Sequence, residues 1–260
     1  MAGRRAGPPE ETLPRRRIFV RGGGGRARGD GGGGGWFKRL FVALLLIAVV
    51  MPGLQAAFHR YVPVWITPLQ VQRIAEGHGL IRDWTPLDAI SPELIRAVIA
   101  SEDSQFCSHW GFDFREIRNA FREWKSGEGL RGASTISMQT ARNVFLWAGR
   151  DPARKALEAY MTPWIEAVWS KKRIMEVYLN VIEWGPGLYG AEAAAQRYFG
   201  KPAADLTRRE ASLMAAVLPG PLQWSPAEPT AYIQRRAGTI QARLPSAPQP
   251  GAGHDPCPVK

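Results

Sequence analysis

The chain has little of several residue types that build common functional sites. Its 260 residues include only two cysteines, Cys107 and Cys257, and four scattered histidines. No Cys/His group has the spacing of zinc ligands, so a zinc site is not expected. No Gly-Lys-Ser/Thr sequence of the Walker type occurs, which argues against that class of nucleotide site. Alternation of apolar and polar residues is also scarce, so a chain built mainly of helices is expected.

The two ends of the chain are not suited to a folded core. Residues 1–39 carry ten Lys/Arg against three acidic residues, a net of +7 out of +11, with ten glycines between Gly22 and Gly35. Such a segment cannot bury enough apolar surface to offset its ordering entropy, so a disordered cytoplasmic tail is expected. Arg/Gly-rich runs can also bind RNA, but the remaining +4 is too small to indicate nucleic-acid binding elsewhere. Residues 245–260 are rich in Pro and Gly and are likewise expected to be disordered.

A long apolar run separates the basic tail from the rest of the chain. Residues 40–58 are apolar except for one glutamine and are interrupted only by one Pro-Gly pair. As a helix, these positions extend about 28 Å, close to the hydrocarbon thickness of a bilayer. Basic residues cluster before the run and few follow it, which orients the tail inwards and the later residues outwards. A cleaved signal peptide would share the basic flank, but its apolar region is usually shorter, so a retained anchor is favoured.

A carboxylate falls on the apolar face of the next clear helix. Ser91 and Pro92 provide its N-cap and first turn. The apolar residues that follow recur at helical spacing: Leu94, Ile95, Val98 and Ile99. Glu102 continues this stripe, so its side chain is partly desolvated, which raises the pKa towards the range where it exchanges protons near neutral pH. A lone glutamate here is more often the polar end of a core helix, but its neighbours favour a functional role.

Start and stop signals mark further helices. Asp151 and Pro152 begin a helix with a kink expected at Pro163. Its apolar stripe contains Leu157, Met161, Trp164, Ile165 and Val168. Thr207 and Glu210 form a capping box, and Gly200 ends the helix before it.

Five segments resemble, in order, the signature motifs of one enzyme family. They are EDSQFCSHWG (102–111), GASTISMQ (132–139), RKALE (154–158), KRIMEVYLN (172–180) and REASLMAAVLP (209–219). The set is similar to that of the peptidoglycan glycosyltransferases of family 51 and runs from about Ile90 to Leu244. Met138 stands where the family commonly has a glutamine, so any substrate contact of that glutamine is not expected here.

The resemblance implies a fold, a domain order and a reaction. The expected fold is mainly α, with a lysozyme-like catalytic lobe and a smaller membrane-facing lobe, preceded by one transmembrane helix. The expected order is tail (1–39), transmembrane helix (40–58), linker and membrane-proximal region (59–89), glycosyltransferase domain (90–244) and tail (245–260). The implied reaction polymerises lipid II into β-1,4-linked glycan strands with release of undecaprenyl diphosphate. The chain ends too soon for a transpeptidase domain, so a monofunctional enzyme is expected.

The same resemblance assigns roles to motif residues. Glu102 removes the proton from the 4-hydroxyl of the acceptor. Glu158 orients or neutralises the diphosphate, directly or through a divalent cation such as Mg²⁺ or Mn²⁺, and no other cofactor or dedicated metal site is expected. The expected substrate-binding residues are Asp103, Phe106, Ser134, Thr135, Gln139, Arg142, Arg150, Arg154 and Lys155.

The second motif also indicates anion binding from its residues alone. Ser134 and Thr135 precede a helical run, so small residues and capping hydroxyls lie at a helix N-terminus, where N–H groups favour an anion. Arginines and a lysine follow within about twenty residues of this helix start. The combination suits a diphosphate better than a nucleotide.

One basic helix has the pattern of a membrane-surface element. Large apolar residues recur at three- and four-residue spacing: Phe114, Ile117, Phe121 and Trp124. Cations flank them: Arg115, Arg118, Arg122 and Lys125. Such a helix lies in the headgroup interface, so membrane lipids are expected partners. An amphipathic helix packed on its own domain would show the same spacing.

The expected partners are lipid II, the growing glycan strand, membrane lipids and other proteins of cell-wall synthesis, without nucleic acid. The expected location is the bacterial inner membrane, with the N-terminus cytoplasmic and the catalytic domain periplasmic. Two alternatives remain open. A glycan-cleaving enzyme also uses two carboxylates on a lysozyme-like fold. A non-enzymatic scaffold would keep Glu102 and Glu158 for structural reasons alone.

The cysteines and one histidine carry separate expectations. An outward-facing domain lies in an oxidising compartment, where disulfides can form. A bridge between Cys107 and Cys257 would tether the tail across the presumed site, so two free thiols are expected. His109 is expected to hold the loop of the first motif by hydrogen bonding rather than to act as a base.

Overall fold

The computed structural model describes residues 3, 33–127, 132–149 and 151–257. Most of the predicted basic tail, and Arg150 of the predicted site, lie outside these residues. Two compact units are distinguished, Met1–Leu44 and Leu45–Lys260. The second unit contains the end of the first helix and every later element.

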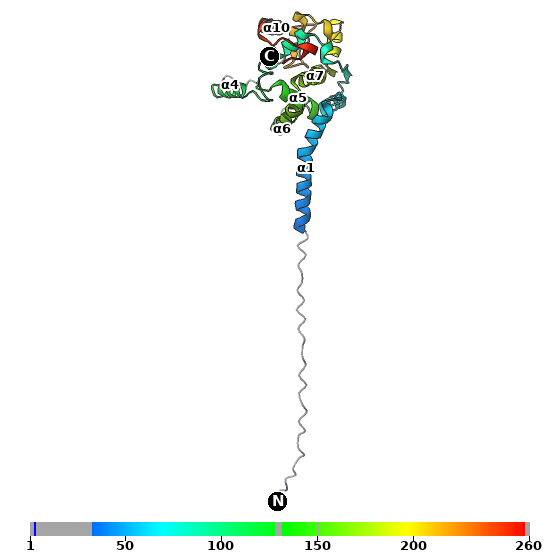
Figure 1. The fold of residues 1–260 in the computed structure, drawn as a ribbon, viewed down its shortest axis with the longest axis vertical. Helices are drawn as coiled ribbons and strands as arrows, with labels where there is room; N and C mark the ends of the chain where they lie inside the picture. The colour runs from blue at the N-terminus through cyan, green and yellow to red at the C-terminus, as the bar shows by residue number, and fades with distance from the viewer. Residues whose placement is uncertain (1–2, 4–32, 128–131, 150, 258–260) are drawn as a thin grey trace. The chain divides into compact units, whose positions relative to one another are not determined.

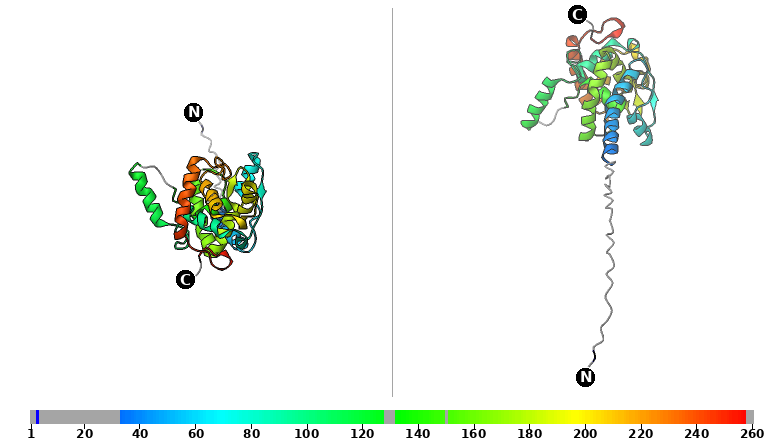
Figure 2. Two further views of the ribbon diagram at one scale, coloured as in Figure 1. Left: turned by 90° about the horizontal axis from the view of Figure 1, so that it is seen from above. Right: turned by 60° about the horizontal axis from the view of Figure 1, so that its bottom comes forward.

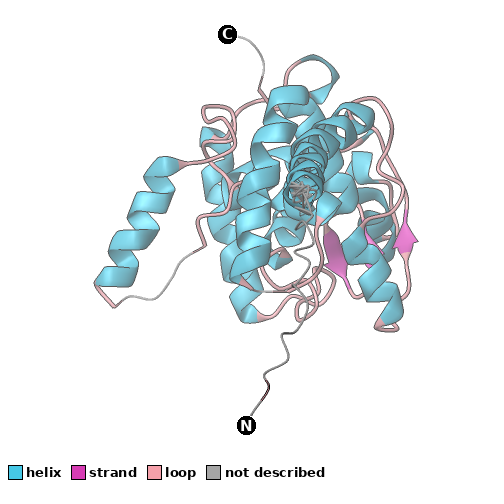
Figure 3. Cartoon of the chain, turned by 90° about the horizontal axis from the view of Figure 1, so that it is seen from below, coloured by secondary structure: helices cyan, strands magenta, loops and turns pink. Residues whose placement is uncertain are grey.

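Helices dominate the described residues (Figure 1, Figure 3). The α-helices are α1 (Gly33–His59), α2 (Pro68–Ala75), α3 (Pro92–Glu102), α4 (Phe114–Lys125), α5 (Ile136–Phe145), α6 (Pro152–Val168), α7 (Lys171–Val181), α8 (Ala191–Phe199), α9 (Arg208–Val217) and α10 (Ala231–Arg243). The 3₁₀ helices are η1 (Leu87–Ala89), η2 (Ala203–Asp205), η3 (Leu244–Ser246) and η4 (Ala252–His254). Strands β1 (Ile81–Arg82), β2 (Glu183–Gly185) and β3 (Leu188–Tyr189) form a small sheet in the order β1-β3-β2, with β1 parallel and β2 antiparallel to β3. The expected mainly α fold is confirmed.

Helix α1 is long and apolar enough to cross a membrane. Its segment Trp36–His59 has 24 residues and a mean hydropathy of 2.4, and it includes the predicted span 40–58. Only 11% of its most apolar stretch is buried, whereas a core helix of a soluble domain would be mostly buried. The chain therefore has one candidate single-pass anchor within its described residues.

Pro52 determines one contact between the end of α1 and helix α6. Proline has no N–H, so the carbonyl of Ala48, four residues earlier, has no intrahelical donor. The hydroxyl of Tyr160 donates to that carbonyl at 2.7 Å. Gly53 brings Trp164 close, because a Cβ at residue 53 would lie 3.1 Å from the indole ring. The last turns of α1 are thus attached directly to the helix that carries the third motif.

Predicted helix ends are confirmed at several positions. Ser91 caps α3 by accepting a hydrogen bond from the N–H of Glu93, and Glu102 is the last residue of that helix. Thr207 and Glu210 form the capping box of α9. Gly200 ends α8 with a φ of 67°, in the left-handed region that glycine adopts at little cost.

The main core lies around α3, α7 and α9. Leu94, Ile95 and Ile99 of α3 and Ile174 of α7 have no exposed surface. Each such side chain contributes about 1.5–3 kcal/mol through burial. Since α3 packs against α9, the C-terminal end of α3 is held rigidly with Glu102 at its last position.

Helix α6 buries a row of polar residues beside the predicted apolar stripe. Its buried residues are Arg154, Glu158, Thr162, Ile165 and Glu166, whereas Leu157 is exposed. Four of these five are polar and follow a four-residue spacing, so they lie on one face. The predicted stripe is confirmed except at Leu157, because Ile165 is buried and Met161, Trp164 and Val168 pack against the core. The adjoining buried polar groups, which the sequence did not indicate, hydrogen-bond to one another and to α5.

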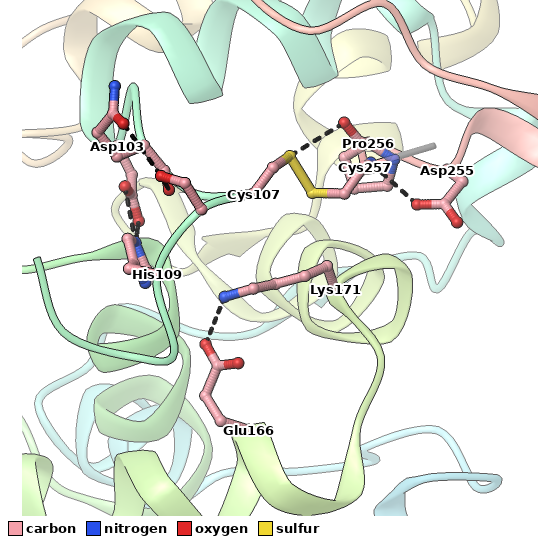
Figure 4. Close-up of a disulfide and its surroundings, with 10 residues drawn as sticks. Asp103, Cys107, His109, Glu166, Lys171, Asp255, Pro256 and Cys257 are labelled. Atoms are coloured by element: carbon pink, nitrogen blue, oxygen red, sulfur yellow. Dashed lines mark hydrogen bonds and ion pairs between the residues drawn. A yellow bond between two sulfur atoms is a disulfide. The ribbon is translucent and has the colours of Figure 1, made fainter. Parts of the chain in front are cut away.

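The expectation of two free thiols is wrong. Cys107 and Cys257 form a disulfide (Figure 4), and residues 245–257, expected to be disordered, are described. The Nδ1 of His254 also lies 2.9 Å from the carbonyl oxygen of Ile90, so the tail docks beside η1. None of the described tail residues lines the cleft that contains Gln139 and Arg142, so the disulfide does not tether the tail across that cleft.

We expect Cys257→Ser to lower the free energy of unfolding by about 2–5 kcal/mol, because the bridge closes a chain segment of 150 residues. Denaturant unfolding of the detergent-solubilised chain, with and without a reductant, measures this loss. The reductant should destabilise the wild type and leave the variant unchanged. Equal stability of oxidised wild type and variant would show that the bridge does not hold the tail.

Candidate active site

The first motif forms a loop, residues 103–111, which we call the motif loop. The carboxylate of Asp103 accepts a hydrogen bond from the N–H of Ile136 at 2.9 Å and lies 2.9 Å from Nε2 of His109. The N–H of Gly111 donates to Nδ1 of His109 at 3.1 Å, so Nε2 carries the proton that is shared with Asp103. The predicted structural role of His109 is confirmed (Figure 4).

Close packing fixes the other residues of the motif loop. Gly111 has a φ of +86°, and a Cβ there would lie 2.8 Å from a methyl of Thr162, so only glycine fits. Phe106 is fully buried, with the Nζ of Lys171 4.7 Å from its ring centre. Phe106 and the buried Asp103 therefore hold the motif loop, and neither is among the residues that line the two cavities described below.

The N-terminus of α5 already has an anion, and it belongs to the chain itself. Thr135 caps the helix by accepting from the N–H of Met138 at 3.1 Å, and its hydroxyl donates to the carbonyl of Gly111. The first N–H group, of Ile136, is taken by Asp103. The prediction of a diphosphate site at this helix end relied on free N–H groups, and the buried carboxylate of Asp103 engages one of them.

Glu102 contacts one residue of each of two cavities, although it is not among the residues that line either. Its side chain is 12% exposed. One carboxylate oxygen, Oε2, accepts from Nε2 of Gln139 at 3.0 Å, and the other, Oε1, lies 3.7 Å from Arg236. Burial raises the pKa of Glu102, while the hydrogen bond from Gln139 and the charge of Arg236 act in the opposite direction and only partly offset it. The direction agrees with the shift predicted from the sequence.

Tyr178 fixes the amide that holds Glu102. Its hydroxyl donates to Oε1 of Gln139 at 3.2 Å, which turns the amide nitrogen of Gln139 towards the carboxylate. Burial and the nearby charge of Glu102 raise the pKa of Tyr178, so its hydroxyl keeps its proton and remains a donor. The resulting chain from Tyr178 through Gln139 to Glu102 sets the orientation of the candidate base.

A cleft of about 700 Å³ lies beside this chain of hydrogen bonds. Its lining includes Gln139, Arg142, Arg154, Tyr178 and Trp224. Arg142 forms no ion pair with any described carboxylate, although its charge reaches Glu102. Nε of Arg154 is buried without a hydrogen-bond partner. Unpartnered guanidinium donors at a cleft wall fit the oxygens of an anionic ligand.

Glu158 organises two cations rather than facing the cleft. It is fully buried and accepts from Nη1 of Arg154 at 3.1 Å and from Nζ of Lys155. Nζ of Lys155 also donates to the hydroxyl of Ser134 at 2.7 Å, and this lysine side chain is 45% exposed. Both oxygens of Glu158 are thus engaged by cations, an arrangement that does not fit a Mg²⁺ or Mn²⁺ ligand.

Sequence reasoning missed several residues that complete the site. Arg236 lies on α10, outside all five motifs, and nothing in its local pattern indicates a contact with Glu102. Glu166 is buried, accepts from the hydroxyl of Ser137 and pairs with Lys171 at 2.7 Å. Glu166 follows Glu158 by eight residues, a spacing that places both on one face of α6, so its burial could have been predicted. Met138 is almost fully buried, so it does not replace a substrate-binding glutamine.

A desolvated carboxylate beside a cleft that contains Arg142, with no described ion pair, and Arg154, with a spare guanidinium donor, defines a site for proton transfer on an anionic substrate. Residues 70–244 match the family described as Transglycosylase. Biosynthetic peptidoglycan transglycosylases from Rhodospirillum centenum and Caulobacter vibrioides are 55% and 51% identical to this chain. The alignments cover 78% of this chain in each case, and 86% and 89% of those relatives. A protein of the same name from Pseudomonas entomophila is 50% identical over 71% of this chain and 81% of its own length. This chain belongs to the transglycosylase family, as the resemblance of its motifs predicts.

Proposed function

We propose that this chain is a peptidoglycan glycosyltransferase that polymerises lipid II into β-1,4-linked glycan strands and releases undecaprenyl diphosphate. The names of its relatives and the family match support this activity. The observation that carries it is the position of Glu102, a desolvated carboxylate between Gln139 and Arg236 at the edge of the arginine-lined cleft. A hydrolase of neutral glycan would have no evident use for the arginines of this cleft.

The proposed step is an inverting displacement. The 4-hydroxyl oxygen of the acceptor, a lipid II molecule, bonds to the anomeric carbon of the growing strand as its proton passes to Glu102. The bond from that carbon to the diphosphate breaks, and its electron pair stays on the departing undecaprenyl diphosphate. Arg142, Arg154 and Lys155 stabilise the charge that develops there, since they are positioned before the reaction begins. Glu158 supports this step by holding two of the cations.

Purified chain and labelled lipid II provide the test. Strand formation by the chain alone, with and without Mg²⁺, is expected, because the described cations serve the diphosphate without a metal ligand at Glu158. Cleavage of purified glycan strands without polymerisation would identify a hydrolytic or lytic enzyme instead. Absence of both activities in a folded chain would support a scaffold.

We also propose that α1 places the catalytic domain on the outer side of the bacterial inner membrane. The Lys/Arg asymmetry around residues 40–58 supports this orientation. The disulfide supports it independently, since such bridges persist in oxidising compartments. Exposed Tyr61 and Trp65 follow α1 directly, as aromatic residues do at a membrane interface.

A reporter fused after Lys260 is therefore expected to be active only when it requires export from the cytoplasm. The matched fusion before Met1 should show the opposite behaviour. Cytosolic activity of the C-terminal fusion would overturn the orientation and, with it, access to the proposed substrate.

Helix α4 supports a membrane-facing role for part of the domain. It stands apart from the other helices in all views (Figure 1, Figure 2, Figure 3). Its large apolar residues are exposed, including 70% of Phe114 and 57% of Trp124, and Ala120 is the buried residue of the helix. This exposure does not fit the alternative of an amphipathic helix packed on its own domain. We assign α4 to the lipid surface, with its cations against headgroup phosphates.

In the chain reconstituted in anionic vesicles, a nitroxide at Phe121→Cys should be accessible to oxygen and protected from a water-soluble nickel chelate. The same label at Glu123→Cys, on the opposite face of α4, is the control and should be reached by the chelate. Equal chelate access at both positions would show that α4 does not lie in the interface.

A further inference from the structure

A second cavity, of about 310 Å³, lies on the other side of Glu102 from the cleft. We call it the α10 pocket. Its lining includes Ser101, Tyr232, Arg235, Arg236, Thr239 and Arg243. Six lining residues come from α10, the last five of these and Ile240, and they recur along one side of that helix, so one face of α10 builds the pocket.

Glu102 contacts one lining residue of the α10 pocket and one of the cleft. Its Oε2 is held by Gln139, which lines the cleft, and its Oε1 faces Arg236, which lines the α10 pocket. An aromatic pair joins the two cavities a second time, because Trp224 of the cleft lies 5.4 Å from Tyr232 of the pocket, measured between ring centres. A sugar unit placed at Glu102 therefore has the cleft on one side and the α10 pocket on the other.

The α10 pocket carries positive charge without matching carboxylates. Arg235 and Arg243 are exposed and form no ion pair with any described residue. Arg236 has its nearest described carboxylate in Glu102, at 3.7 Å, and its Nε is buried without a hydrogen-bond partner. Three guanidinium groups in one small cavity, with donors to spare, fit a planar anion that accepts two parallel hydrogen bonds.

We propose that the α10 pocket binds a carboxylate of the peptide carried by the sugar unit at Glu102. This inference rests on the proposed function, which supplies a disaccharide-pentapeptide substrate. A carboxylate is favoured over a diphosphate because a lipid-linked diphosphate must stay near the membrane. Helix α10 packs against α9 and α3, whereas the end of α1 contacts α6, and α10 lies at the far end of the domain from it (Figure 1). The peptide is the part of the substrate that is free to extend in that direction.

The experiment compares three lipid II substrates: one with free peptide carboxylates, one with those carboxylates amidated, and one without the peptide. The full-length chain carries Arg235→Gln together with Arg243→Gln, two residues that do not touch Glu102. The control carries Arg197→Gln with Arg209→Gln, which removes the same charge from exposed positions outside both cavities. For each protein, kcat and KM of polymerisation are measured.

We expect the pocket variant to raise KM for the free-carboxylate substrate by roughly tenfold, since each partly exposed arginine pair is worth up to about fivefold in affinity. Its kcat, and its KM for the amidated and peptide-free substrates, should match the control. An equal rise in KM for all three substrates would mean that the pocket binds a phosphate, and unchanged KM for all would mean that it binds no part of the substrate. Either result overturns the proposal while leaving polymerisation intact, whereas failure of the wild type on every substrate would refute the proposed function itself.

Discussion

Glu102→Gln is expected to reduce polymerisation of lipid II by at least about a hundredfold, which is the lower end of what a general base contributes. Glutamine keeps the shape of the side chain and still accepts a hydrogen bond from Gln139, but it cannot take the proton of the acceptor hydroxyl. Binding of lipid II should persist, because the cations of the cleft are unchanged. The measurement is single-turnover polymerisation together with a binding titration of the same protein.

The matched control is Glu228→Gln, an exposed glutamate outside both cavities. It should polymerise at the wild-type rate. Near wild-type activity of Glu102→Gln would remove Glu102 from the mechanism. Loss of binding in that variant, with normal unfolding, would mean that Glu102 holds substrate and another group is the base.

The pH dependence follows from the surroundings of Glu102. A general base works only when it is ionised, so the rate should fall as the pH falls through the pKa of Glu102. Burial raises that pKa, so this acid limb of the pH–rate profile should lie at higher pH than for an ordinary glutamate. Arg236 and Gln139 both favour the charged form of Glu102. The charge of Glu102 in turn raises the pKa of Tyr178 on α7. Replacing Arg236 by Gln removes one of the groups that lower the pKa, so the acid limb should move to higher pH. A limb that stays in place would show that another group controls the rate.

Sequence alone was sufficient where local chemistry decides the structure. The N-cap of α3 at Ser91 and the capping box of α9 depend on residues within a few positions of one another. The raised pKa of Glu102 was also predictable, since its place on an apolar stripe implies desolvation.

The remaining features depend on contacts between distant segments. The disulfide of Cys107 and Cys257 requires the tail to return to the motif loop, which no local pattern in residues 245–260 indicates. Asp103 was assigned to substrate because its motif suggested so, but the N–H of Ile136 and the ring of His109 use its carboxylate. Arg236 reaches Glu102 only because α10 packs beside α3.

The two glutamates of the site differ most in what surrounds them. Glu102 is 12% exposed and has no ion pair closer than 3.7 Å, whereas Glu158 is fully buried between Arg154 and Lys155. A carboxylate in the first setting can exchange a proton with a ligand. A carboxylate in the second setting holds cations in place, and its removal leaves a buried charge without a partner.

Glu158→Gln is therefore expected to act first on stability. Arg154 is buried, so loss of its partner should lower the free energy of unfolding by about 3–5 kcal/mol, the cost of breaking a buried ion pair. Affinity for lipid II should fall as well, because Lys155 and Arg154 lose the group that orients them. Denaturant unfolding and a binding titration of the same preparation measure both effects.

Two further variants separate the roles of the cations. Combining Glu158→Gln with Arg154→Gln removes both buried charges and should recover part of the lost stability, although not the affinity for the diphosphate. Lys155→Gln should weaken binding with little change in stability, since nearly half of that side chain is exposed. Glu158→Gln with wild-type stability but no turnover would contradict this assignment, because it would place the carboxylate in the chemical step rather than behind the cations that serve it.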